Sequence, residues 1–362
     1  MLDKVASTLD SKSHAFRQMR TTPKMPSVIF LFGPTATGKT ALALHLAERL
    51  PCDIISVDSI QVYSGLNIGS AKPSQDILRD YPHHLVDIRE PENVYSVADF
   101  YSDAKALVLA SLEAGRIPLF VGGSMMYFAA LERGIARLPG ADMALRAHIV
   151  AMAARYGWAY WHAYLQDVDP VTAAALAPRD SQRLQRAVEV WMQTGQSLRQ
   201  LQQDAHQPGL QDWLEHKMPG TRLISLGLVV EDRPLHQTRL ETRFRTMLAS
   251  GLLEEVAGLY HRPGLDLSLS ALNSVGYRQV WQYLQGSLSY AEVLSQALVA
   301  NRRLAKHQMT WLRAWSGARL FACEGAGLCA AVGDYVSGQL GFAKCGVVTK
   351  ETNNQVLLNV NN

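Results

Sequence analysis

The residues with the clearest chemical potential lie near the start of the chain, between an apolar run and a helix-forming segment. Residues 27–32 (SVIFLF) have the pattern of a buried strand, and residues 41–50 (ALALHLAERL) that of a helix. Between them lie Gly33, Pro34, Thr35, Ala36, Thr37, Gly38, Lys39 and Thr40. These eight residues match the pattern G-x-x-x-x-G-K-[ST] in the strand-to-helix context that the pattern requires.

The chemistry that such a segment supports is the binding of a diphosphate or a triphosphate. Its glycines let consecutive backbone N–H groups point into one concavity, and the helix N-terminus adds its dipole. Lys39 supplies a positive charge to the outer phosphate, and Thr40 can hold Mg²⁺. We therefore expect all eight residues to line a phosphate site, although the pattern does not name the reaction.

A candidate acid–base residue follows the next predicted strand. Residues 53–57 (DIISV) form an apolar run that ends at Asp58. In an open parallel sheet, ligands bind outside the carboxyl ends of the strands, so Asp58 should face the bound phosphates. This placement favours a base acting on an acceptor beside a diphosphate.

Two other functions remain compatible with these residues. A small-molecule or nucleotide kinase would also have a phosphate loop and an acid in this region. A non-catalytic RNA-binding NTPase switch needs an Asp for the metal, but the strand at residues 118–121 ends in Gly122-Gly123-Ser124. Asp87 could replace it, although we favour a turn-forming role for Asp87 before Arg89 and Pro91.

The surrounding elements predict an α/β fold. Strands at residues 27–32, 53–57, 85–88 and 118–121 alternate with helices, notably at residues 97–113, which predicts a parallel sheet covered on both faces. Residues 141–194 have almost purely helical patterning, residues 223–230 restore a strand, and long helices are expected at residues 235–261 and 289–315.

We therefore expect a P-loop NTPase-like parallel sheet with helices on both faces, interrupted by an all-helical insertion domain. The expected parts are a loose N-terminal arm (1–24), the core (25–139 and 220–322), the insertion (140–219) and a C-terminal tail (323–362).

Composition limits the remaining possibilities. Apolar residues make up 48% of the 362-residue chain, which is enough for a full core. The 35 Lys and Arg exceed the 32 Asp and Glu only slightly, so nucleic-acid binding must depend on local patches. The four cysteines have no zinc-like spacing and are expected to be reduced thiols. Because no apolar run reaches 18 residues and no signal peptide is recognisable, we expect a cytoplasmic protein without a membrane partner.

Seven segments in consistent order over residues 27–318 together resemble the tRNA dimethylallyltransferase (tRNA isopentenyltransferase) family. They are GPTATGKT, SVDSIQVYSGLNIGSAKPS, HHLVDIREP, PLFVGGSMMY, SQRLQRAVEV, SVGYRQ and LAKHQMTWLR. The resemblance implies transfer of a dimethylallyl group from dimethylallyl diphosphate to N6 of the adenosine 3′ to the anticodon, in tRNAs that read codons beginning with U. Diphosphate is released, and we expect the enzyme to be a monomer.

The resemblance also implies roles for individual residues. The phosphate loop would bind the diphosphate of the donor, with Mg²⁺ as cofactor. Asp58 matches the catalytic Asp that accepts a proton from the attacking amine. Ser124 occupies the position of a family Thr that contacts substrate, and Arg243 matches an Arg that helps to hold the diphosphate.

Residues from six places in the sequence are implied to contact the anticodon stem-loop of tRNA. Two of these segments depart from the common forms of the family: His307 replaces an Arg, and the Asn273-Ser274 pair differs from the usual residues. The implied contacts are Asp58, Ser59, Ile60, Gln61 and Ser124 near the target base; Arg146, Gln182, Arg183, Leu184, Gln185 and Arg186 in the insertion; Leu272, Asn273, Ser274, Val275, Gly276 and Tyr277; and Lys306, His307, Gln308, Met309, Thr310, Trp311, Leu312 and Arg313.

The last of these segments also has a composition typical of RNA-binding surfaces. Residues 294–322 contain no acid, and five basic residues lie there: Arg302, Arg303, Lys306, Arg313 and Arg319. Trp311 and Trp315 add stacking surface. Because the two tryptophans are four residues apart on one predicted helical face, an equally good interpretation places them in the core.

Overall fold

The computed structural model describes residues 25–204 and 206–341. The predicted N-terminal arm lies outside this part of the chain. Within it, six parallel strands form one sheet in the order β3-β2-β4-β1-β5-β6. Their bounds are β1 Ser27–Phe32, β2 Cys52–Val57, β3 His83–His84, β4 Ile117–Gly122, β5 Arg222–Val229 and β6 Arg319–Ala322.

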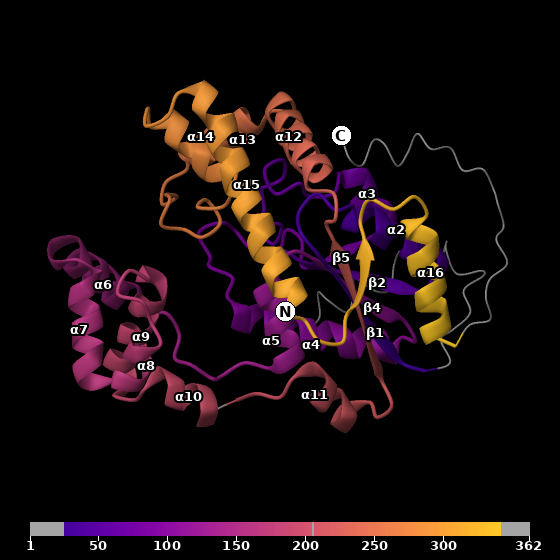
Figure 1. The fold of residues 1–362 in the computed structure, drawn as a ribbon, viewed down its shortest axis with the longest axis horizontal. Helices are drawn as coiled ribbons and strands as arrows, with labels where there is room; N and C mark the ends of the chain where they lie inside the picture. The colour runs from indigo at the N-terminus through magenta and orange to yellow at the C-terminus, as the bar shows by residue number, and fades with distance from the viewer. Residues whose placement is uncertain (1–24, 205, 342–362) are drawn as a thin grey trace. The chain divides into compact units, whose positions relative to one another are not determined.

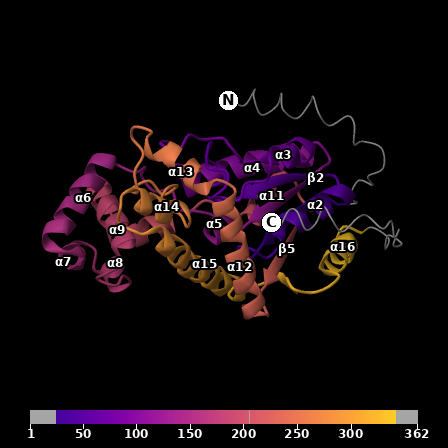
Figure 2. The same ribbon diagram turned by 90° about the horizontal axis from the view of Figure 1, so that it is seen from above.

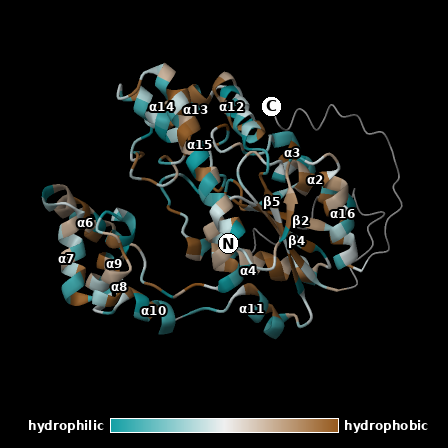
Figure 3. Cartoon of the chain, viewed as in Figure 1, coloured by the Kyte–Doolittle hydropathy of each residue, from teal (hydrophilic) through white to brown (hydrophobic). Residues whose placement is uncertain are grey.

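Helices cover both faces of this sheet (Figures 1 and 2). Alternate residues of β1 point to opposite faces. Ile29 and Leu31 join a core cluster with α2 (Lys39–Arg49) and α16 (Leu328–Gln339). Phe30 and Phe32 instead contact Phe128 of α5 (Met125–Arg133), with ring centroids 5.3 and 5.1 Å apart. The central strands are accordingly mostly hydrophobic in Figure 3, as the prediction of a two-sided buried sheet requires.

Two predicted elements differ from the structure for local reasons. The strand expected at residues 85–88 is replaced by the shorter β3, because Leu85 and Asp87 have positive φ angles of 61° and 53° and cannot continue an extended strand. The helix expected at residues 235–261 is divided into α12 (Arg233–Ala249) and α13 (Leu252–Tyr260), because Gly251 has a φ of 100°.

The segment predicted as a C-terminal tail contributes to the core where the structure describes it. Helix α16 buries Val332 and Val336, and Leu340 beside it is also buried, in the same cluster as α2. Residues 342–362 lie outside the described part of the chain. The other helices of this part are α3 Gln75–Asp80, α4 Val97–Glu113, α14 Tyr277–Leu284 and α15 Tyr290–Arg313.

The chain divides into two compact units. One comprises residues 1–128 and 214–362 and contains the sheet; the other is Ala129–Trp213. The second unit is helical and packs around Trp161, Leu165, Leu184 and Val188. Its helices are α6 Met143–Tyr156, α7 Trp158–Val168, α8 Pro170–Ala174, α9 Ser181–Thr194 and α10 Leu198–Asp204, and α11 (Leu210–Lys217) straddles the second boundary.

No helix in the described residues is both long enough and apolar enough to cross a membrane.

Candidate active site

The phosphate loop connects β1 to α2 and has the backbone of a concave cradle. Ala36 and Gly38 have φ angles of 61° and 81°, and α2 begins immediately afterwards at Lys39. Inside the loop, the buried Thr37 donates from Oγ1 to the carbonyl of Pro34 at 2.8 Å. Successive amides in left- and right-handed conformations form an anion-binding concavity, to which the start of α2 adds its dipole.

Lys39 is held over this loop in an environment that disfavours its charge. Its Nζ donates to the carbonyl of Pro34 at 2.5 Å. Burial and the charge of Arg243 lower the pKa of Lys39 to about 7, although Asp58 and Cys323 act in the opposite direction. An anion bound in the loop would place negative charge beside Lys39 and so favour the charged form of this side chain.

Asp58 follows β2 and is oriented by the chain immediately after it. One of its oxygens, Oδ1, accepts hydrogen bonds from the backbone N–H groups of Ile60 at 2.8 Å and Gln61 at 3.2 Å. Among the described residues Oδ2 accepts no hydrogen bond. This Asx-type turn fixes the carboxylate while leaving one oxygen available for a proton.

Arg243 on α12 completes a cluster of three charged side chains. Burial lowers the pKa of Arg243, and the Asp58 carboxylate opposes that shift. Arg243 and Asp58 thus lie near enough to Lys39 to shift its pKa, and Asp58 lies near enough to Arg243 to shift the pKa of that guanidinium. Two cations and one carboxylate beside a phosphate loop can bind an anionic group and accept a proton from a neighbouring atom.

The end of β4 explains why no acid follows this strand. A Cβ on Gly122 would lie 1.9 Å from the carbonyl oxygen of Val57, so β4 approaches β2 too closely for a side chain. Next to it, Ser124 accepts the backbone N–H of Ser59 through Oγ at 3.1 Å. Ser124 is therefore placed beside the Asp58 turn.

The side-chain amide of Gln61 forms its hydrogen bonds within the protein. Its Oε1 accepts from Ser56 Oγ at 3.0 Å, and its Nε2 donates to the carbonyls of Ser70 and Ala71, both at 3.3 Å. The side chain proposed to meet the target base thus braces the loop after Asp58.

The predicted tRNA-contacting residues divide by exposure. Trp311 is 39% exposed, whereas Trp315 lies beyond the end of α15, is buried, and has its ring centroid 4.8 Å from that of Phe32. The exposed members are Ser59, Gln182, Arg183, Asn273, Lys306, His307, Thr310, Trp311 and Arg313. The buried members, whose contacts are within the protein, are Leu184, Leu272, Gly276, Tyr277, Gln308 and Leu312.

Two arginines predicted to contact tRNA have an internal partner. Glu189 on α9 has a fully buried side chain and accepts from Arg146 Nε at 2.9 Å and from Arg186 Nη1 at 2.7 Å. Burial alone would raise the pKa of Glu189, but the hydrogen bonds from both arginines and from the Asp142 amide outweigh it and lower that pKa. Arg183 remains 75% exposed beside Asp180.

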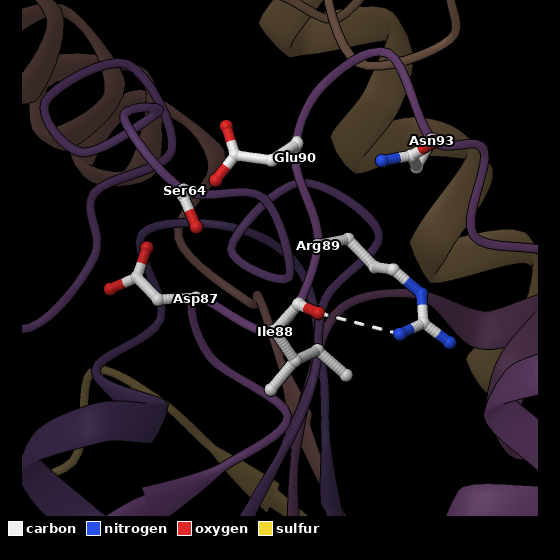
Figure 4. Close-up of a pocket in the computed structure, with 6 residues that line it drawn as sticks. All are labelled: Ser64, Asp87, Ile88, Arg89, Glu90 and Asn93. Atoms are coloured by element: carbon white, nitrogen blue, oxygen red, sulfur yellow. Dashed lines mark hydrogen bonds between the residues drawn. The ribbon is translucent and has the colours of Figure 1, made fainter. Parts of the chain in front are cut away.

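Asp87, the alternative metal ligand, forms an ion pair with Lys72, whose side chain is almost fully buried. Asp87 also lines an open pocket of about 280 Å³ with Ser64, Ile88, Arg89, Glu90 and Asn93. Figure 4 shows the Asp87 and Glu90 carboxylates on the Ser64 side of this pocket, with the Arg89 side chain directed away from them. The favoured interpretation of Asp87 as a turn residue agrees with its positive φ and its ion pair.

The sequence did not indicate the contacts by which three residues shape this region. His236 and Gln308 contact the phosphate loop from helices more than 200 residues away in sequence. Glu255 on α13 accepts the amides of Asn67, Ile68 and Gly69. For Gln308 a signal was present, since it shares the helical phase of the buried Ala305 and Leu312.

Comparisons with known proteins agree on one family. Residues 61–315 match the model of the IPP transferase family. A tRNA dimethylallyltransferase of Thioalkalivibrio sulfidiphilus is 47% identical over 302 residues, which cover 83% of this chain and 92% of that protein.

Solved structures show the same similarity. The tRNA isopentenylpyrophosphate transferase of Bacillus halodurans has a TM-score of 0.62 and 31% identity, over 87% of this chain and 97% of that one. A eukaryotic dimethylallyltransferase solved while acting on tRNA has a TM-score of 0.68 at 19% identity, over 93% and 84% of the two chains, which shows a common fold.

Proposed function

The chain belongs to the IPP transferase family, and from this premise we propose that it transfers a dimethylallyl group from dimethylallyl diphosphate to tRNA. The acceptor is N6 of the adenosine 3′ to the anticodon. The observation that carries the proposal is the cluster of Lys39, Asp58 and Arg243 beside the phosphate loop. Family membership does not favour the kinase alternative.

The donor end of the proposed site binds and stabilises the leaving diphosphate. The loop amides, Lys39 and Arg243 offer positive charge where negative charge develops as the bond between the allylic carbon and oxygen breaks. Because these groups are already in place, little reorganisation is needed at the moment of reaction.

The acceptor end needs a base, since the exocyclic amine of adenine is a weak nucleophile. As N6 forms its bond to the allylic carbon, its proton passes to the free Oδ2 of Asp58. The amides of Ile60 and Gln61 hold Oδ1 and keep the carboxylate in position. Ser124, through its contact with the Ser59 amide, supports the same turn.

We propose Mg²⁺ as the cofactor of this site. The described residues contain no cluster of three or more His, Cys, Asp or Glu, so a cation would be held mainly by diphosphate oxygens and water. The half-buried Thr40, the second residue of α2, is the side chain we propose to hold it. When bound, Mg²⁺ neutralises charge on the diphosphate.

The exposed Lys306, Arg313 and Trp311 of α15 and Arg183 of α9 are proposed to bind the anticodon stem-loop. Charged side chains position the RNA backbone, while the residues around Asp58 select the base. We also propose that the protein is a cytoplasmic monomer and that it acts on tRNAs that read codons beginning with U.

The test is to incubate the purified protein with unmodified tRNA, Mg²⁺ and labelled dimethylallyl diphosphate, with ATP in a parallel reaction. Digested tRNA should contain N6-(dimethylallyl)adenosine, and ATP should remain intact. Consumption of ATP without prenylated nucleoside would instead support the kinase.

A further inference from the structure

One residue of the phosphate loop, Thr35, is held through both its backbone N–H and its backbone carbonyl by helices far away in the sequence. The backbone N–H of Thr35 donates to Gln308 Oε1 on α15 at 3.0 Å. The Thr35 carbonyl accepts from His236 Nε2 on α12 at 2.9 Å. Gln308 and His236 are only 7% and 6% exposed, so water competes little for either contact.

Gln308 has a second contact that reaches the end of β4. Its Nε2 donates to the carbonyl of Gly123 at 2.9 Å. A Cβ on Gly123 would lie 2.6 Å from that nitrogen, so the amide fits this position only because residue 123 is glycine. One side chain therefore joins the phosphate loop to the segment that carries Ser124, whose Oγ accepts the Ser59 amide beside Asp58.

The position of the contact matters because the next residue is strained. Ala36 has a φ of 61°, which a non-glycine residue adopts only when its surroundings enforce it. One of the two residues that hold Thr35 lies on a helix that also carries a charged residue of the site. His236 and Arg243 are seven residues apart on α12 and lie on the same helical face, so one face provides both a cation and a support for the loop.

We propose that Gln308 and His236 are positioning residues that hold the backbone of Thr35, and with it the phosphate loop, in the shape that binds the donor diphosphate. The inference rests on the proposed function for the identity of the donor. It assigns the Thr35 amide to Gln308, so the amides that contact the diphosphate are those after Thr35. It also gives Gln308, from the predicted tRNA segment, a role on the donor side.

The test compares variants that remove a contact with variants that keep it. Gln308→Leu removes both contacts of this side chain, whereas Gln308→Glu keeps an acceptor for Thr35 and loses the donor to Gly123. His236→Leu removes the donor to the Thr35 carbonyl, and His236→Gln keeps an N–H in a similar place. Gln296→Leu, at an exposed position of the same helix, is the matched control.

The readouts are the Kd of inorganic diphosphate with Mg²⁺, measured by calorimetry, and the KM and kcat for dimethylallyl diphosphate. Each lost hydrogen bond should weaken diphosphate binding and raise KM about tenfold, with tRNA affinity unchanged. His236→Gln should recover most of the loss seen in His236→Leu, and Gln296→Leu should behave as wild type.

Folded variants with unchanged diphosphate affinity would overturn the inference, as would a fall in kcat alone with no rescue by His236→Gln. If Gln308→Leu does not fold, the Gln308→Glu and His236 variants decide by the same criteria. A wild-type protein that binds diphosphate but transfers no dimethylallyl group would refute the proposed function. The diphosphate affinities of the variants would still test whether Gln308 and His236 position the phosphate loop.

Discussion

Asp58 is the residue on which the proposed reaction depends most, because the reaction needs a base beside the attacking amine. Its carboxylate is oriented by backbone amides rather than by side chains, so a change at this position need not disturb its neighbours. Asn is the closest replacement, since its carbonyl oxygen can still accept the amides of Ile60 and Gln61.

Asp58→Asn should lower the rate of transfer by about 10² to 10⁴ and change tRNA affinity by no more than a few-fold, because it removes a base and keeps a positioning oxygen. Single-turnover transfer and filter-binding measurements with the same tRNA would check both parts. Near-normal turnover in the variant would show that another group accepts the proton.

Lys39 leads to a prediction about pH. Burial and the charge of Arg243 favour its neutral form, so the free protein loses the Lys39 proton as pH rises through about 7. Bound diphosphate favours the charged form. Above pH 7 binding should therefore take up a proton, and diphosphate affinity should fall as pH rises.

Calorimetry at pH 8 in buffers of different ionisation enthalpy measures this uptake. Diphosphate itself binds protons, so the quantity to compare is the difference between wild type and Lys39→Ala. Equal proton uptake in the two proteins would mean that Lys39 does not change protonation on binding. Lys39→Ala should also weaken donor binding and slow transfer together.

At the scale of elements, α13 fixes the loop that follows the Asp58 turn. Both oxygens of Glu255 are used: they accept the amides of Asn67, Ile68 and Gly69 at 2.8 to 3.2 Å and the hydroxyl of Tyr277 at 2.5 Å. Burial and the Glu255 charge raise the pKa of Tyr277, so it stays a donor at neutral pH. The predicted tRNA residue Tyr277 thus helps to support a loop.

Glu255→Gln should lower the free energy of unfolding by about 1 to 3 kcal/mol, because an amide has one acceptor oxygen where four donors converge. The exposed neighbour Glu254 provides the control Glu254→Gln, which should stay within about 0.5 kcal/mol of wild type. Urea unfolding of both proteins tests the difference. Equal midpoints would show that the loop does not depend on this carboxylate.

At the scale of the whole molecule, the sequence was most informative where structure depends on neighbours along the chain. The phosphate loop, the position of Asp58 after β2 and the parallel sheet all follow from local patterns. Arg243 was placed at the site only through resemblance. The contacts of His236, Gln308 and Glu255 join distant segments, and a local pattern does not specify such partners.

Charge shows the same limit. Arg146, Arg183 and Arg186 look alike in the sequence, but only the fold shows that two of them bind Glu189 and that Arg183 is exposed. On α15, the basic residues Arg302, Arg303, Lys306 and Arg313 are all exposed, while Gln308 and Leu312 between them face the protein. The distribution of free positive charge is thus a property of the folded chain.

This distribution predicts how tRNA affinity depends on salt. Each phosphate contact releases counterions, so Lys306→Ala and Arg313→Ala should each reduce the slope of log K against log salt concentration by about 0.7 to 0.9. Both substitutions should weaken the binding of all tRNAs to the same extent. Arg79→Ala, which removes an exposed arginine already paired with Asp76, should leave the slope unchanged. Binding measured from low to moderate salt decides the matter. Unchanged slopes for Lys306→Ala and Arg313→Ala would show that this face of α15 is a solvated surface that does not bind tRNA. Base selection should be the same in both variants, since it depends on the residues around Asp58.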